Sequence, residues 1–459
     1  VSFSGVAIPE NCVVRTFRVK VMSSPAKERR AKEMLVAAGD AWAWTIDRFH
    51  RRRRDDLPAS NSNIEIWPDL RAHGSFGELT MHCSQDIAKC WSANFFAAKR
   101  RQKRGEEASL PLAKRYLMPV SWRKGEFSLT VESRFPDGSR RRPSVVLATA
   151  RGCEPLSLSL SHDHPYDQAA VRAVRLLEDA GELFLDVTAW VQIVRAEVDP
   201  EMIAGIDPGI IHPLAIVTGE KALLISGRAT RAEEFLHLED QKGRDVCQSR
   251  YRAPVRARKG RPHQPGSRRW RKIAERKRRE EAKSRRKVRL AANRAARVAV
   301  GFVESNHAGV IAMGDPSGIE QRDSGRVQNR RTARWLRASA RDAVRYRAEE
   351  RGIAFLAVDE RGTSSRCPSC GEPAAKNGRR LICQGPLCRE EHHRDIAGVQ
   401  NIAQNSGAVV TRVALIEHRR VGQPSRRDRR RRRYDASRGE ARTWAVEAGL
   451  PATRSLVAS

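Results

Sequence analysis

The chain has 459 residues, of which 40% are hydrophobic, and its 87 Lys and Arg against 54 Asp and Glu give a formal net charge of +33 at pH 7. This length predicts more than one domain, each with its own core. The charge predicts an anionic partner, most simply nucleic acid, because Lys and Arg that neutralise phosphates release counterions. An anionic membrane surface is the alternative partner. The sequence contains no run of about 18 apolar residues, the length needed to span a bilayer.

The first 200 residues predict one unit that mixes helices and strands. Segments 13–22, 127–131, 144–150 and 183–194 have the pattern of strands. Two helices are expected over 26–50 and 84–103, and we interpret their apolar stripes as core and not as base-stacking platforms. The stripes contain Ala31, Leu35, Ala38, Trp42, Ile46 and Phe49 in the first helix, and Ile87, Trp91, Phe95 and Ala98 in the second. No segment near Val1 has the pattern of a signal peptide, so we expect a cytoplasmic protein.

From residue 203 the pattern changes to that of an α/β domain. Short apolar runs at 203–206, 213–219, 309–315 and 353–359 predict strands, and 330–350 predicts a helix with Leu336, Ala340, Ala343 and Val344 facing inward. Strands that alternate with helices indicate a sheet with helices packed on it. The chain after residue 407 loses this pattern, and we expect 408–459, with Arg429–Arg433, to be a disordered basic tail.

Residues 241–287 are densely basic. A solvated helix face is the usual explanation of such a run. Here the run continues into a buried stripe of Val288, Ala291, Ala295, Val298 and Phe302. We therefore predict one helix over 266–302 that docks by its C-terminal half. Its N-terminal half would line a nucleic-acid groove with Arg268, Arg269, Arg271, Lys272 and Lys277.

Four of the nine cysteines lie close together in the sequence. Cys367 and Cys370 have two residues between them, and Cys383 and Cys388 follow with four residues between them. Two thiolate pairs on a short connection are typical of a closed, tetrahedral, structural zinc site. Because the second spacing is longer than usual in zinc ribbons, His392 and His393 are minor candidate ligands.

Three carboxylates end or follow strand-like runs: Asp207, Asp315 and Asp395. An isolated Asp in such a place is usually a turn former or a helix cap. Together they could meet at one end of the sheet and hold two divalent ions, Mg or Mn, that activate water for phosphodiester hydrolysis.

Four segments in order over 203–403 resemble the RuvC-like nucleases of the transposon-encoded TnpB family and of the related compact type V CRISPR effectors. GIDPGI at 205–210 is similar to the first RuvC motif, and 334–353 is similar to the helix before the last segment. VDERGTSSRCPSCG at 358–371 matches the family's Thr-Ser before a CxxC knuckle. HRDIAGVQNIA at 393–403 is similar to the third RuvC motif.

The resemblance implies an α/β, RNase H-like (RuvC) nuclease domain over 201–362 and 393–407, with a zinc ribbon inserted at 363–392. The N-terminal 1–200 would be a mixed β-barrel wedge and a helical recognition lobe. Guide RNA and double-stranded target DNA are the implied partners. Asp207 and Asp395 are implied to be metal-binding catalytic acids, and the four clustered cysteines zinc ligands. Whether the protein is a monomer or a dimer is left open.

The second RuvC motif departs from the family, which usually has Glu where this chain has Met313-Gly314-Asp315. Asp315 is the expected third acid, ahead of Glu304 and Glu320, which lie toward a helix end and in a loop. The main hypothesis is an RNA-guided, metal-dependent DNA endonuclease. The alternatives are an RNA-guided protein that occupies DNA with little or no cleavage, and a transposase-like or resolvase-like protein without a guide.

Overall fold

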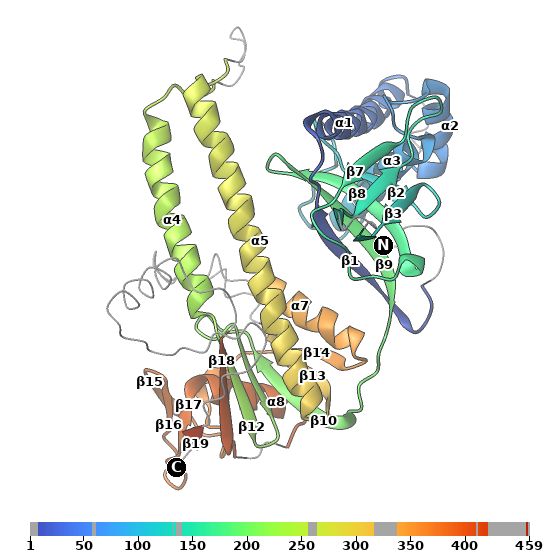
Figure 1. Cartoon of the computed structure of the whole chain (residues 1–459). Coiled ribbons are helices and arrows are strands. Elements are labelled where there is room, and N and C mark those ends of the chain that lie inside the picture. Colours follow the sequence, from blue (N-terminus) through green and yellow to red (C-terminus); the bar gives the residue numbers. More distant parts are fainter. Residues whose placement is uncertain are drawn as a thin grey trace. The chain divides into compact units, whose positions relative to one another are not determined.

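A computed structural model describes residues 8–56, 61–131, 133–134, 140–255, 264–315, 337–409, 412–420 and 456–457. The chain divides into two compact units, Val1–Gln192 and Ile193–Ser459 (Figure 1). Glu320, Leu336 and the arginine run of the predicted tail lie outside the described residues. No helix in the described ranges is long and apolar enough to cross a membrane.

The N-terminal unit contains antiparallel sheets and three helices. Its four-stranded sheet has the order β1-β9-β8-β2, and a three-stranded sheet has the order β3-β6-β7. The strands are β1 (Cys12–Lys20), β2 (Val120–Arg123), β3 (Phe127–Thr130), β6 (Ser144–Leu147), β7 (Leu156–Ser159), β8 (Val171–Asp179) and β9 (Glu182–Gln192), with a short pair β4 (Ser133–Arg134) and β5 (Arg140–Arg141). The helices are α1 (Pro25–Arg54), α2 (Asn63–His73) and α3 (Met81–Lys103).

The apolar stripes of α1 and α3 form the core of this unit. Every stripe residue named in the sequence analysis is buried in both helices, so their interpretation as core is confirmed. The sequence pattern does not predict α2, which is short and has Pro68 inside it. The Ser62 side chain accepts a hydrogen bond from the Glu65 backbone N–H at its start, and Ile66 and Leu70 are its buried residues. Two buried residues in one helix are too few for a periodic signal.

The C-terminal unit is built on one mixed sheet, which confirms the predicted α/β class. The sheet order is β14-β13-β10-β11-β12-β18-β19. β10, β11 and β12 are antiparallel neighbours, and β13 and β14 continue the sheet parallel to β10. The strands are β10 (Asp199–Asp207), β11 (Leu214–Thr218), β12 (Lys221–Ser226), β13 (Ala308–Asp315), β14 (Ala354–Asp359), β18 (Leu415–Arg420) and β19 (Leu456–Val457).

β18 lies inside the segment that the sequence predicts to be disordered. It pairs in parallel with β12 over Leu415 to Arg420, so this part of the tail prediction is wrong. The strand has only two apolar residues at its start, and its backbone pairing with the apolar β12 supplies what its own sequence pattern lacks.

Helices cover both faces of this sheet. Side chains of α5 (Arg268–Ser305) and α7 (Arg337–Glu350) pack with Ile206 and Met313 on one face. Side chains of α8 (Arg394–Asn405) pack with Ala215 and Leu224 on the other. Strand residues therefore alternate between an α5/α7 face and an α8 face, as the period of two requires.

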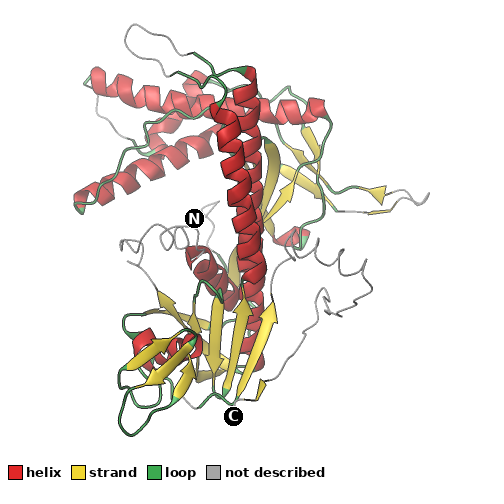
Figure 2. Cartoon of the chain, turned by 90° about the vertical axis from the view of Figure 1, so that its left-hand side faces the viewer, coloured by secondary structure: helices red, strands yellow, loops and turns green. Residues whose placement is uncertain are grey.

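α5 forms a long helical hairpin with α4 (Arg228–Ser249), and both extend away from the sheet of this unit (Figures 1 and 2). The single long helix is confirmed. Its C-terminal half is buried at Ala292, Ala295, Ala296, Ala299, Val300, Phe302 and Val303, while Val288, Ala291 and Val298 are half-buried. The sequence did not predict α4, whose contacts with α5 are largely polar: His237 Nε2 lies 2.8 Å from Glu281 Oε2, and Lys287 Nζ 3.3 Å from Glu233 Oε2.

A small three-stranded sheet is inserted between β14 and α8. Its order is β15-β16-β17, with β15 (Ala374–Asn377), β16 (Arg380–Cys383) and β17 (Glu391–His393). A 3-10 turn over Thr363–Ser365 precedes it. This placement agrees with the predicted inserted ribbon.

Candidate functional site

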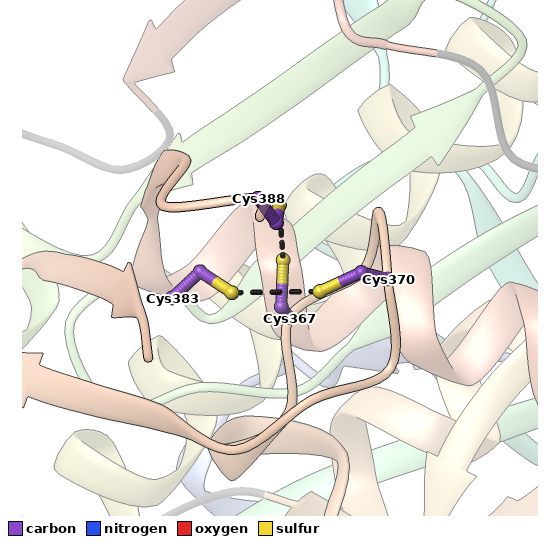
Figure 3. Close-up of side chains that lie close together, drawn as sticks. All are labelled: Cys367, Cys370, Cys383 and Cys388. Carbon is purple, nitrogen blue, oxygen red and sulfur yellow. Dashed lines mark hydrogen bonds between the residues drawn. The ribbon is translucent and has the colours of Figure 1, made fainter. Parts of the chain in front are cut away.

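The four clustered cysteines converge on one point (Figure 3). Their sulfur atoms all lie within 4.8 Å of one another. The Sγ atoms of Cys367 and Cys388 are 3.8 Å apart, and those of Cys370 and Cys383 are 3.4 Å apart. Sulfurs bound tetrahedrally to zinc at about 2.3 Å are about 3.8 Å apart. The donor set and its spacing therefore fit one zinc ion.

Two tight turns aim these thiols at one another. The Gly371 N–H donates to Cys367 O at 2.9 Å, which closes the first knuckle, and Gly371 has a φ of +78°. In the second knuckle the Gly385 N–H donates to Cys383 Sγ at 3.3 Å. Of the minor candidates, His392 has its Nε2 3.5 Å from Cys367 Sγ, whereas His393 lies near His212 and not in the cysteine cluster.

A second candidate site lies where α8 crosses the end of β10. Asp207 ends β10, and Asp395 is the second residue of α8. Two glycines allow the helix to approach the strand. A Cβ added at Gly205 would lie 2.7 Å from Val399 O, and one added at Gly398 would lie 3.3 Å from Asp207 Oδ2. The glycines of the first and third motifs thus bring Asp207 and Asp395 together.

The two carboxyl groups differ in protonation. Burial raises the pKa of Asp207 to about 7, the negative charge of Asp395 contributes to the increase, and Arg394 opposes both effects. Burial alone would raise the pKa of Asp395 as well, but the hydrogen bond and charge of His212 lower it overall. A half-buried, poorly compensated carboxylate beside a second one is the environment that a divalent cation neutralises. The hard oxygen donors suit Mg or Mn.

His212 is a residue of this site that was not predicted from the sequence. Its Nδ1 lies 2.6 Å from Asp395 Oδ2, and its ring is buried. The Gly209 N–H donates to His212 O at 3.1 Å, and a Cβ at Gly209 would lie 2.7 Å from that same oxygen. The turn after Asp207 therefore needs glycine to place His212. Its proximity in sequence to Asp207, within GIDPGIIH, was the available signal.

Asp315 is not brought to Asp207 and Asp395. Its Oδ2 accepts from Arg341 of α7 at 2.7 Å, so it lies on the α5/α7 face, whereas Asp207 lies on the α8 face. Of its proposed substitutes, Glu304 has its Oε2 3.5 Å from Arg351 Nε, and Glu320 lies outside the described residues.

The predicted basic residues of α5 fall into two groups. Arg268, Arg269, Arg271 and Lys272 are exposed near the helix start, where the Arg269 guanidinium lies 5.8 Å from the centre of the Tyr251 ring. Lys277 instead forms an ion pair with Asp245 of α4 and donates to Gln248 Oε1 at 2.9 Å. Lys277 therefore holds the hairpin together, and the first four residues present the exposed basic surface.

Residues 338–402 match the Cas12f1-like, TNB domain family. They contain the zinc cluster and Asp395. No curated protein is similar enough in sequence to count as a relative.

Solved structures are similar to the chain in fold. A Cas12f1-sgRNA-target DNA complex has a protein of 13% identity and TM-score 0.56, and the match covers 86% of this chain and 99% of that one. The mini-RNA-guided endonuclease CRISPR-Cas_phi3 has 11% identity and TM-score 0.51, covering 89% and 94%. These matches confirm the predicted fold class: a RuvC-type core with an inserted zinc ribbon.

Proposed function

We propose that this chain is related to the TnpB and compact type V effectors and is an RNA-guided DNA-binding protein that cleaves its target with a metal-dependent site; its fold and the TNB-domain match over 338–402 support the proposal. The pairing of Asp207 with Asp395 under α8 carries the proposal. Guide RNA and target DNA are proposed as partners by analogy, because the similar Cas12f1 protein was solved in a complex with an sgRNA and target DNA.

Asp207 and Asp395 would hold Mg or Mn, which when bound activates water and stabilises the leaving oxygen. The protein's own contribution is positional. His212 fixes the orientation of the Asp395 carboxylate through its 2.6 Å contact, and the burial of Asp207 makes that carboxylate favour a cation. Ligand orientation by such partners supports metal affinity.

The charge of +33 supports extensive binding to phosphate backbones. Arg268, Arg269, Arg271 and Lys272 would contact phosphates from the outer end of the hairpin. Residues 1–200 would act as the wedge and recognition lobe that hold guide RNA and target DNA. The ribbon, residues 363–392, would be structural.

One observation favours the second candidate function, an RNA-guided protein that occupies DNA without cutting it. Asp315, the acid expected at the second RuvC motif, faces away from Asp207. With Asp207 and Asp395 as the only two of the three predicted acids at the site, binding could persist while cleavage is lost.

The deciding experiment sequences the RNA that co-purifies with the protein and then tests cleavage of a matching DNA duplex. Wild type should cut in Mg or Mn, and Asp207→Ala should bind the guided target without cutting. Asp342→Ala is the matched control, since Asp342 is an exposed carboxylate of α7 paired only loosely with Arg345 at 3.6 Å. Tight guided binding with both strands intact in Mg and in Mn would favour occupancy instead, and absence of a specific RNA would contradict a guided function altogether.

A further inference from the structure

Strand register decides which carboxylates share the α8 face. Ile206 of β10 pairs with Met313 of β13 in parallel, so the next position along, Asp207, lies beside Gly314. Gly314 in turn pairs with Val358 of β14. Neighbouring residues in paired strands point to the same face. Of the second-motif residues, it is therefore Gly314, and not Asp315, that lies on the same face of the sheet as Asp207.

The next residue after β14 that points to this face is Glu360, two positions after Val358. Its side chain lies over Gly314. A Cβ added at Gly314 would lie within 2.6 Å of Glu360 Cγ and closer still to Oε1. Any other residue at 314 would collide with the Glu360 side chain. Because Gly314 has no side chain, the space beside it at the second motif is free for a glutamate that follows the neighbouring strand.

The backbone of Glu360 is held by the same helix that carries Asp395. Thr363, in the 3-10 turn after β14, donates its N–H and its Oγ1 to Glu360 O at 3.2 and 2.9 Å. The buried Asn401 of α8 donates from Nδ2 to Thr363 O at 2.6 Å and to Arg366 O at 2.9 Å. α8 therefore fixes both Asp395 and the loop that begins at Glu360.

We propose that Glu360 is the third acidic metal ligand of the site, that Gly314 is required to admit it, and that Asp315 has a structural role with Arg341. This inference rests on the proposed nuclease function and deepens it. Among the described residues only the four cysteines bring three or more ligand atoms within 4.8 Å of one another. Asp207, Asp395 and Glu360 do not meet that spacing, so the proposal is for ligands shared between two ions about 3.5–4 Å apart and not for three ligands on one ion.

The test measures Mn²⁺ binding to the full-length protein by electron paramagnetic resonance, together with guided DNA cleavage. Glu360→Gln keeps the shape of the side chain and removes its charge. We expect it to weaken Mn²⁺ binding by about tenfold or more and cleavage by about a hundredfold. Gly314→Ala should lower both without changing any charge, because the added methyl displaces Glu360. Asp359→Asn is the matched control, since Asp359 is the adjacent carboxylate, is 67% exposed and points to the other face.

Zinc content and the melting temperature show whether each variant is folded. Loss of binding and cleavage in Asp315→Asn, with both retained in Glu360→Gln, would overturn the inference while leaving the proposed function intact. If wild-type Mn²⁺ binding does not depend on Asp207 and no DNA is cut, the proposed function fails and this inference fails with it.

Discussion

The two candidate metal sites of the C-terminal unit are built in opposite ways. The zinc ligands come from two turns of one short insertion, between Cys367 and Cys388. The carboxylates Asp207 and Asp395 are 188 positions apart in the chain and meet only because α8 packs on β10. A local site keeps its geometry as long as its turns form, whereas a site assembled from several elements depends on register and helix packing.

Removing zinc ligands should have the largest effect. We expect about one zinc per chain by metal analysis, and Cys367→Ser together with Cys383→Ser should abolish it, because structural zinc contributes about 10–16 kcal/mol of apparent binding free energy to such folds. The ribbon should unfold, seen as new protease cleavage within 363–392. Cys247→Ser is the control, since Cys247 is exposed on α4 and far in sequence from the cluster. Retention of zinc by the double variant would contradict the assignment.

When no divalent ion is added, the ionised Asp207 carboxylate should lower the free energy of unfolding. The pKa of Asp207 is raised from 3.8 to about 7, so the folded state binds the proton more tightly than the unfolded state does. Stability should therefore fall as pH rises from about 4 through 7. Asp207→Asn should raise the free energy of unfolding at pH 8 by up to about 4 kcal/mol, at about 1.4 kcal/mol per pKa unit.

Denaturant unfolding at pH 8 and at pH 4 measures this difference, which should nearly vanish at the lower pH. The protein should be dialysed without chelator so that zinc stays bound. A difference between variant and wild type that is independent of pH would mean that Asp207 ionises normally in the folded protein.

His212 tests whether orientation matters at the assembled site. His212→Ala should lower cleavage and Mn²⁺ affinity by about 10–100-fold, because Asp395 is then without the partner that positions it. His212→Asn, which keeps a hydrogen-bond donor, should recover part of both. His418→Ala is a comparison, since its ring centre lies 6.4 Å from that of His212, while the 2.6 Å bond to Asp395 belongs to His212. Equal losses in His212→Ala and His212→Asn would indicate a packing role only.

The smallest effect should come from the exposed basic residues. Arg271→Glu with Lys272→Glu should weaken binding to all targets alike and reduce the slope of log affinity against log salt by about 1 for each phosphate that is no longer neutralised. Lys277→Gln should change the salt slope less, because Lys277 is engaged with Asp245. A changed sequence preference with the same slope would mean that this surface reads bases.

Local patterns in the sequence were enough to predict the zinc cluster, most strands of the α/β sheet, the long basic helix and the buried stripes of α1 and α3. Each depends on spacing within a few turns or on a period of two or 3.6 residues, which the chain carries without knowledge of its neighbours. The motif resemblance added Asp207 and Asp395. α4 was missed because its partner is another charged helix, and β18 because its pairing is supplied by β12.

Only the tertiary structure decided which acid could accompany Asp207. In a strand, a shift of one residue moves a side chain to the opposite face, so Gly314 and Asp315 face opposite sides of the sheet although they are adjacent in sequence. Glu360 follows a different strand, and its position over Gly314 results from the pairing of β13 with β14. No pattern within one segment contains that pairing, because register is set by contacts between residues that are distant in the chain.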